Sequence, residues 1–221
     1  MDFLKAFLLG LIQGLTEFLP VSSSGHLAVT QKILGLEGPI LFFDVMLHFG
    51  TLIAIFIVFA KDIRLILFSM ISKTSGQHLG AARLGWLAIL GTVPIGITGI
   101  LLHDWIERAF ESVPMVGCMF IVTGFMLFST RKLGGKRKEK ELRVRDAIWV
   151  GVCQAIALLP GISRSGMTIG GGLWLGIQRE VAVRLSFMMA IPAIVGALVL
   201  KLLELPDQVQ PIGIGPILIG T

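Results

Sequence analysis

Charged side chains are scarce in this sequence. Only 15% of its 221 residues are Asp, Glu, Lys or Arg, whereas soluble domains contain about 25%. Hydrophobic residues make up 54% of the chain, and the mean hydropathy is +0.86. This composition excludes an ordinary soluble domain and indicates a membrane protein. The net charge of +5 does not indicate a nucleic-acid partner, because the positive residues lie in short loops between apolar runs, where they orient membrane proteins.

Cysteine is almost absent as well. Cys118 and Cys153 are the two cysteines, each lies inside an apolar segment, and no CxxC motif occurs. A disulfide framework and a zinc site are therefore excluded. The N-terminal hydrophobic run also lacks an A-x-A-like cleavage site before Ser22, so we expect this segment to stay in the protein rather than to act as a signal peptide.

Long hydrophobic segments, by contrast, recur along the chain. A membrane-crossing helix needs about 20 apolar residues, and four segments come close to this length: 42–60, 84–102, 113–130 and 185–204. A further segment begins at 212. Two shorter segments, 3–18 and 24–35, are separated by Pro20 and an SSSG turn, which predicts a re-entrant hairpin over 3–35. The predicted fold is an all-α integral membrane protein.

The distribution of charge over the loops predicts the orientation. The loops 61–83 and 131–146 are rich in Lys and Arg, whereas the 104–111 loop is mainly acidic. Positive loops face the cytoplasm, so the acidic loop is expected outside. Followed backward through the 42–60 span, this orientation makes the first hairpin enter from the outside.

The sequence also matches itself at a shift of 141 residues, which places 10–27 over 151–168 without a gap. The second copy begins after the cytoplasmic 131–146 loop, so its hairpin, 147–177, is expected to enter from the opposite side. We therefore predict two inverted-topology repeats, 1–140 and 141–221, whose hairpin tips meet. The second repeat looks incomplete, as in a fragment or a shortened homologue. The identical positions are Gly10, Gln13, Ser22, Ser24 and Gly25 on Gly151, Gln154, Ser163, Ser165 and Gly166.

Gln13 and Glu17 are four residues apart and therefore share one helix face. Their oxygens are the ligand type of hard cations, so the pair predicts a site for a divalent metal, Mg²⁺ or Ca²⁺. The structural alternative is that Glu17 merely neutralises Arg164. Since an ionisable group at mid-membrane costs at least ~2.5 kcal/mol, we favour a functional site.

The first hairpin turn carries hydroxyl groups and a histidine. Ser23 is a candidate nucleophile, and His26 is a candidate acid or base. Ser22 and Ser24 are candidate substrate-binding groups. Turn formation and helix capping are the alternative roles of the serines.

In the second hairpin, Arg164 is the residue that most clearly indicates a phosphate-binding site. Its planar guanidinium suits a phosphate group, and the helix start that follows it adds backbone N–H donors. Its candidate substrate-binding neighbours are Ser163, Ser165 and Thr168. In the 42–60 span, Asp44, His48 and Thr51 lie along one face and either support this site or only line a water path.

At these residues the sequence resembles a known family. The Gln13-x-x-x-Glu17 pattern, FLPVSSSGH (18–26), FDVMLHFGT (43–51) and PGISRSGMT (160–168) closely resemble the undecaprenyl-pyrophosphate phosphatases, the bacitracin-resistance family. The resemblance implies hydrolysis of the lipid-carrier diphosphate to the monophosphate used in bacterial cell-wall synthesis. It also implies divalent-metal dependence, an outward-opening site in the inner membrane, and roles for Glu17, Ser23, His26 and Arg164.

Three questions stay open at the level of sequence. The attacking group is Ser23 or a metal-bound water. A transporter or flippase of an anionic lipid phosphate is the alternative function, since inverted repeats with broken helices are also transporter architecture. A carrier, however, has no use for Ser23, His26 and Glu17 together. The expected partners are a polyprenyl diphosphate and the bilayer, without nucleic acid, and a homodimer is left open.

Overall fold

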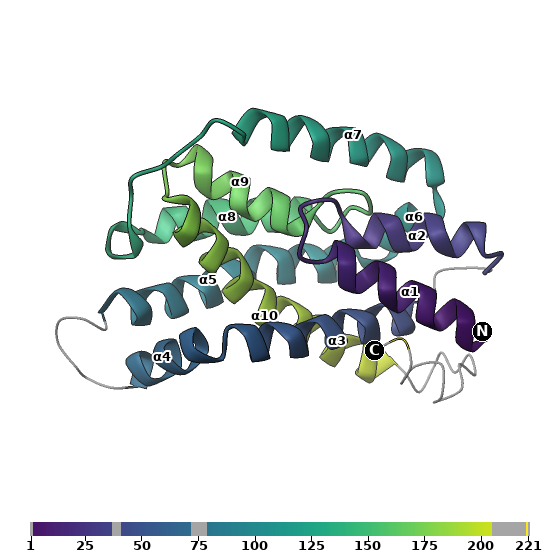
Figure 1. The fold of residues 1–221 in the computed structure, drawn as a ribbon, viewed down its shortest axis with the longest axis horizontal. Coiled ribbons are helices and arrows are strands. Elements are labelled where there is room, and N and C mark those ends of the chain that lie inside the picture. The colour runs from purple at the N-terminus through teal and green to yellow at the C-terminus, as the bar shows by residue number, and fades with distance from the viewer. Residues whose placement is uncertain (1, 37–40, 72–78, 205–219, 221) are drawn as a thin grey trace.

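The protein is helical throughout its described part, so the prediction of an all-α fold is confirmed. The computed structural model describes residues 2–36, 41–71, 79–204 and 220. Within these ranges it contains no strand, only an isolated bridge between Arg137 and Ile177. Its helices (Figure 1) are α1 (Phe3–Thr16), α2 (Ser23–Ile33), α3 (Leu41–Val58), α4 (Ala60–Ile71), α5 (Leu79–Leu101), α6 (His103–Glu111), α7 (Val113–Thr130), the short 3-10 helix η1 (Glu139–Glu141), α8 (Val144–Ile156), α9 (Arg164–Trp174) and α10 (Arg179–Glu204).

Helices of membrane-spanning length occur where the sequence predicts them. Three are long and apolar enough to cross a bilayer, namely Leu79–Leu101, Val113–Thr130 and Arg179–Leu200. They coincide with the expected spans 84–102, 113–130 and 185–204, although α5 and α10 begin earlier than expected. These helices define a multi-pass membrane protein. The segment expected from 212 lies outside the described residues, except for Gly220.

Two helices were not expected. The 61–83 segment, predicted as a loop, contains α4, which is bent by 79° from the preceding α3; these two helices meet the criteria for a span only as a pair. The predicted 104–111 loop is the helix α6. Its apolar residues Trp105, Ile106, Ala109 and Phe110 follow a helical period among acidic ones. The helix therefore has one face suited to packing and one suited to water.

The helices bury a core and leave apolar side chains on the outside. The largest buried cluster joins α4, α5, α8 and α10 and includes Leu84, Val150 and Met189. Large apolar side chains such as Ile100 and Phe125 are 65% and 71% exposed. So many exposed apolar residues on several helices suit contact with lipid rather than with water.

The two halves of the chain repeat the same helix pair. The α1 and α2 helices begin at Phe3 and Ser23, whereas α8 and α9 begin at Val144 and Arg164, a shift of 141 residues in both cases. The helices α2 and α9 each contain 11 residues, which is about half of what a bilayer crossing requires. Figure 1 shows that the two turns joining these pairs approach each other near the middle of the molecule. The repeat boundaries at 140 and 141 stay a prediction.

One arginine ties the basic loop to the end of α9. The Arg137 guanidinium pairs with both carboxylate oxygens of Asp146 and donates to the Leu175 carbonyl at 3.1 Å. The Arg137 backbone N–H donates to the Gly176 carbonyl, also at 3.1 Å. Burial by itself raises the pKa of Asp146, but the hydrogen bonds from Arg137 and from the Arg143 N–H outweigh it, so the net pKa lies below its ordinary value.

We expect Arg137→Ala to destabilise the protein by roughly 3 kcal/mol at neutral pH, because the buried Asp146 carboxylate loses its partner. Since the pKa of Asp146 is lower in the folded than in the unfolded state, the pair stabilises at neutral pH, and its contribution is lost as the pH falls through the folded-state pKa. The difference from wild type should therefore shrink in acid. Thermal unfolding in detergent measures it, with the exposed neighbour Lys136→Ala as control; equal effects of both variants would contradict the assignment.

Candidate active site

The two hairpin turns are built alike. The Ser22 hydroxyl accepts a hydrogen bond from the Gly25 N–H at 3.3 Å, and the Ser163 hydroxyl accepts one from the Gly166 N–H at 3.1 Å. Both serines therefore cap the helix that follows. Ser22 has a φ of 66° and is the one non-glycine residue with positive φ in the described part of the chain. Such a backbone costs free energy and is a feature of functional turns.

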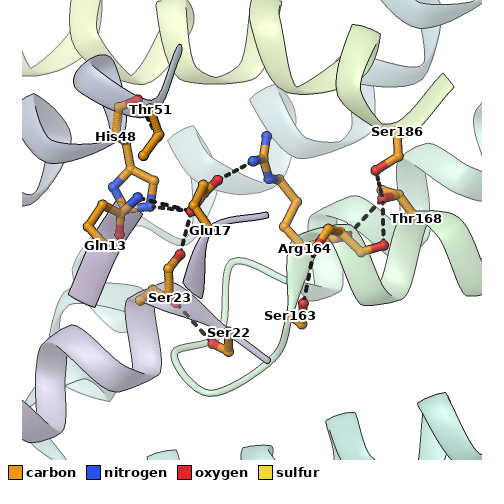
Figure 2. A network of polar contacts seen from close by, with 12 residues as sticks. Gln13, Glu17, Ser22, Ser23, His48, Thr51, Ser163, Arg164, Thr168 and Ser186 are labelled. Atoms are coloured by element: carbon orange, nitrogen blue, oxygen red, sulfur yellow. Dashed lines mark hydrogen bonds and ion pairs between the residues drawn. The ribbon is translucent and has the colours of Figure 1, made fainter. Parts of the chain in front are cut away.

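Glu17, which follows the last residue of α1, lies at the centre of the polar cluster (Figure 2). Its Oε2 accepts hydrogen bonds from the Ser23 hydroxyl and, at 3.0 Å, from the Gln13 amide, while its Oε1 pairs with the Arg164 guanidinium. The Glu17 side chain is only 5% exposed. Ser23 and Arg164 are the first residues of α2 and α9, so both hairpins reach the same carboxylate.

Next to this cluster lies a cavity of about 240 Å³. Its polar wall includes Glu17, Ser23 and Arg164. The opposite wall is apolar and is contributed by α5, α6 and α10, through residues such as Ile95, Ile106, Phe110 and Ile194. The cavity therefore combines a charged end with a lipid-like end.

His48 of α3 belongs to the cluster, although the sequence placed it only on a supporting face. Its Nδ1 donates to the Asp44 carbonyl at 2.7 Å, which leaves Nε2 directed at Glu17 Oε2, 3.5 Å away. Both Asp44 and His48 line the cavity. The spacing of these two residues on one helix face was the available signal. The proximity of His48 to Glu17 depends on the packing of α3 against α1, which the sequence does not specify.

His26, the expected acid or base, is placed differently. Its Nδ1 contacts the Ser22 carbonyl at 2.8 Å, and its ring packs edge-on against Phe120 of α7, with 5.0 Å between centroids. Among the described residues that line the cavity, His26 is absent. The structure does not bring it to Glu17, and its catalytic role stays a prediction.

Of the remaining candidate substrate-binding residues, four line the cavity and one, Thr168, does not. Ser22, Ser24, Ser163 and Ser165 line the cavity. The Ser163 and Ser165 hydroxyls lie 3.3 Å apart. Thr168, by contrast, shares a hydrogen bond of 2.6 Å with Ser186 of α10 and donates to the Arg164 carbonyl at 2.8 Å. Thr168 therefore links α9, the helix that carries Arg164, to α10, and it is not among the described residues that line the cavity.

The expected metal ligands are close together. The Gln13 amide nitrogen faces Glu17, and the Gln13 Oε1 is buried without a hydrogen-bond partner in the described structure. No group of three or more His, Cys, Asp or Glu residues suited to a metal occurs in the described ranges. Magnesium, however, commonly binds to one or two protein oxygens and completes its shell with water and substrate phosphates. Glu17 and Gln13 offer oxygens for that mode of binding, and the metal site itself stays a prediction.

The protein is a multi-pass helical membrane protein. Its cluster of arginine, carboxylate and hydroxyl groups beside an apolar cavity has the features of a binding site for an amphiphilic anion. A protein-family model, bacitracin resistance protein BacA, matches residues 6–221. The chain belongs to this family.

Three curated relatives share one name, undecaprenyl-diphosphatase. The chain is 44% identical to the undecaprenyl-diphosphatase of Nocardioides sp. (strain ATCC BAA-499 / JS614), over 100% of this chain and 82% of the relative. It is 45% identical to the undecaprenyl-diphosphatase of Methanosphaera stadtmanae, over 89% of this chain and 76% of the relative. A third undecaprenyl-diphosphatase, from Desulfosudis oleivorans, is 45% identical over 93% and 79% of the two chains.

Proposed function

We propose that this protein is a membrane phosphatase that hydrolyses undecaprenyl diphosphate to the monophosphate and inorganic phosphate. The relatives' shared name supports this activity over transport. The observation that carries the proposal is the convergence of Ser23 and Arg164, the first residues of two helices, on the carboxylate of Glu17. A carrier would need the arginine but not the hydroxyl–carboxylate pair.

The diphosphate binds where the two helices begin. Helix N-termini favour anions, because their first N–H groups lack helical partners. One guanidinium nitrogen of Arg164 is engaged by Glu17, whereas its Nη1 is buried and has no hydrogen-bond partner in the described structure. This Nη1 is the donor available to a phosphate oxygen. The apolar wall of the cavity lies where the lipid chain leaves the diphosphate.

The chemistry follows from the Ser23–Glu17 contact. The Ser23 oxygen bonds to the terminal phosphorus, its proton passes to Oε2 of Glu17, and the bond from that phosphorus to the bridging oxygen breaks. The lipid monophosphate departs with the bridging oxygen. Water then hydrolyses the phosphoserine and releases inorganic phosphate. A divalent cation held by Glu17 and the Gln13 Oε1, when bound, supplies positive charge that neutralises the diphosphate.

Phosphate release tests this proposal directly. The purified protein in detergent should release inorganic phosphate from undecaprenyl diphosphate, and a chelator should suppress the reaction, with Mg²⁺ or Ca²⁺ restoring it. Binding of the lipid without phosphate release would favour a carrier. Unchanged activity in the chelator would overturn the metal assignment alone.

The proposal includes a topology. The two helix pairs are re-entrant hairpins of opposite orientation in the bacterial inner membrane, and the cavity opens to the outer side. The repeated helix boundaries and the Lys- and Arg-rich 131–146 loop support this arrangement. The loop should then face the cytoplasm and α6 the outside.

Cysteine labelling in intact cells tests the topology. With Cys118 and Cys153 replaced by serine, Arg108→Cys in α6 should react with an impermeant thiol reagent, whereas Lys136→Cys should react only after lysis. Both positions are exposed, so accessibility to water is matched. Labelling of Lys136→Cys alone in intact cells would reverse the orientation.

A further inference from the structure

An apolar groove of about 510 Å³ lies between α5, α6 and α8. It begins just beyond the point where α5 and α8 pack most closely: a Cβ on Gly151 would lie 2.3 Å from the Gly91 carbonyl oxygen. Pro94 of α5 forms part of the wall. Pro94 lies inside the continuous helix α5, where it cannot donate the helical hydrogen bond. Its ring also lies close to α8, 3.0 Å from a Cβ placed on Gly151.

This groove lies next to the cavity beside Glu17, since Ile106 of α6 and Leu158, which follows α8, line both spaces. The lipid end of a substrate whose diphosphate lies in the cavity therefore has an apolar groove beside it. The groove's walls contain almost no polar side chains, Thr98 and the Trp105 indole being the exceptions.

The outer rim of the groove is open. Ile97 and Val152 are 54% and 41% exposed, and Trp105 is 50% exposed. In a protein surrounded by lipid, such a rim faces the acyl chains. Trp105 belongs to α6, and tryptophan prefers the membrane–water interface. The groove therefore extends from the interface toward the hydrocarbon.

We propose that this groove binds the first isoprenoid units of the lipid substrate and so determines the preference for long prenyl chains. The inference rests on the proposed phosphatase function and names the tail site that accompanies it. A chain attached to a diphosphate at Arg164 must leave the cavity, and the apolar groove adjoins the cavity at Ile106 and Leu158. Burial of the chain there contributes binding energy that a short diphosphate cannot gain.

A matched pair of variants tests the groove. Ile97→Trp fills it, whereas Ile100→Trp adds the same bulk to the same helix outside it; the two isoleucines are similarly exposed, 54% and 65%. Both variants are assayed with undecaprenyl diphosphate and with the five-carbon dimethylallyl diphosphate. Ile97→Trp should lower kcat/KM for the long substrate by about ten-fold or more, because lost burial of about two methylene groups corresponds to that factor. Its kcat/KM for the short substrate should stay within about three-fold of wild type.

An equal loss on both substrates with Ile97→Trp, or an equal loss of chain-length preference with Ile100→Trp, would overturn the groove assignment. Photo-crosslinking provides a second test that does not depend on turnover. A long-chain prenyl phosphate with a photoreactive group near the headgroup should label peptides containing 93–102 and 152–159; labelling elsewhere would contradict the proposal. A wild-type protein that hydrolyses neither substrate would instead refute the proposed function.

Discussion

Arg164→Lys is expected to lower kcat/KM for undecaprenyl diphosphate by about 100-fold or more, although it preserves the charge. The Arg164 guanidinium contacts Glu17 through Nη2 and leaves Nη1 free for the substrate. Lysine offers a single ammonium group, which cannot hold the carboxylate and a phosphate oxygen in one plane. Steady-state phosphate release measures the loss.

Arg184→Lys is the matched control for this prediction. Arg184 pairs with Asp62 and Glu139 away from the cavity, and its side chain is 41% exposed. Its replacement should leave turnover near wild type. Near-normal activity of Arg164→Lys would show that positive charge suffices at that position. It would contradict the proposal that Arg164 contacts Glu17 and a phosphate oxygen at the same time.

Ser23→Ala should abolish turnover, by about 1,000-fold or more, while leaving substrate binding largely intact. The Ser23 hydroxyl donates to Glu17, which is positioned to take its proton. In the proposed mechanism, Arg164 would still hold the diphosphate in this variant. If water attacks instead, Ser23 only positions the substrate. Its removal would then cost one hydrogen bond, about 1–3 kcal/mol or roughly 5- to 150-fold in rate.

The size of the loss therefore distinguishes the two mechanisms. Phosphate release and equilibrium binding of the lipid should be measured on the same Ser23→Ala preparation. Ser69→Ala removes a serine that is equally buried but lies in α4 and does not line the cavity, so it should leave turnover unchanged. A Ser23→Ala protein that keeps a tenth of its rate would eliminate covalent catalysis and leave the phosphatase assignment standing.

The sequence predicted that Glu17, Ser23 and Arg164 lie together, because the information for this contact is local and repeated; their catalytic roles stay predictions. The 141-residue shift aligns the turn at Ser22 with the turn at Ser163, and the structure reproduces the shift in the starts of four helices. Ser23 and Arg164 are equivalent under that shift. Two hairpins of similar sequence that each place a polar residue at a helix start predict a shared polar site, and both residues contact Glu17.

The features that the sequence missed depend on packing between segments. His48 reaches Glu17 because α3 packs against α1, and His26 turns to Phe120 because α2 packs against α7. Neither contact follows from spacing along the chain. The helix α6 differs from the prediction for another reason: its acidic residues suggest a loop, although the spacing of its apolar residues fits a helix.

The Arg164–Glu17 pair also has a consequence for biogenesis. The two residues are separated by 147 positions, and at about 5–20 residues per second the ribosome needs roughly 7–30 s to reach the arginine after the glutamate. During that interval the first hairpin carries an acid without its counter-ion, which hydrocarbon does not tolerate in charged form. In the proposed topology we therefore expect the first hairpin to reach its final depth only after the second has been synthesised. Insertion and assembly of the candidate site would then be one late, coupled event.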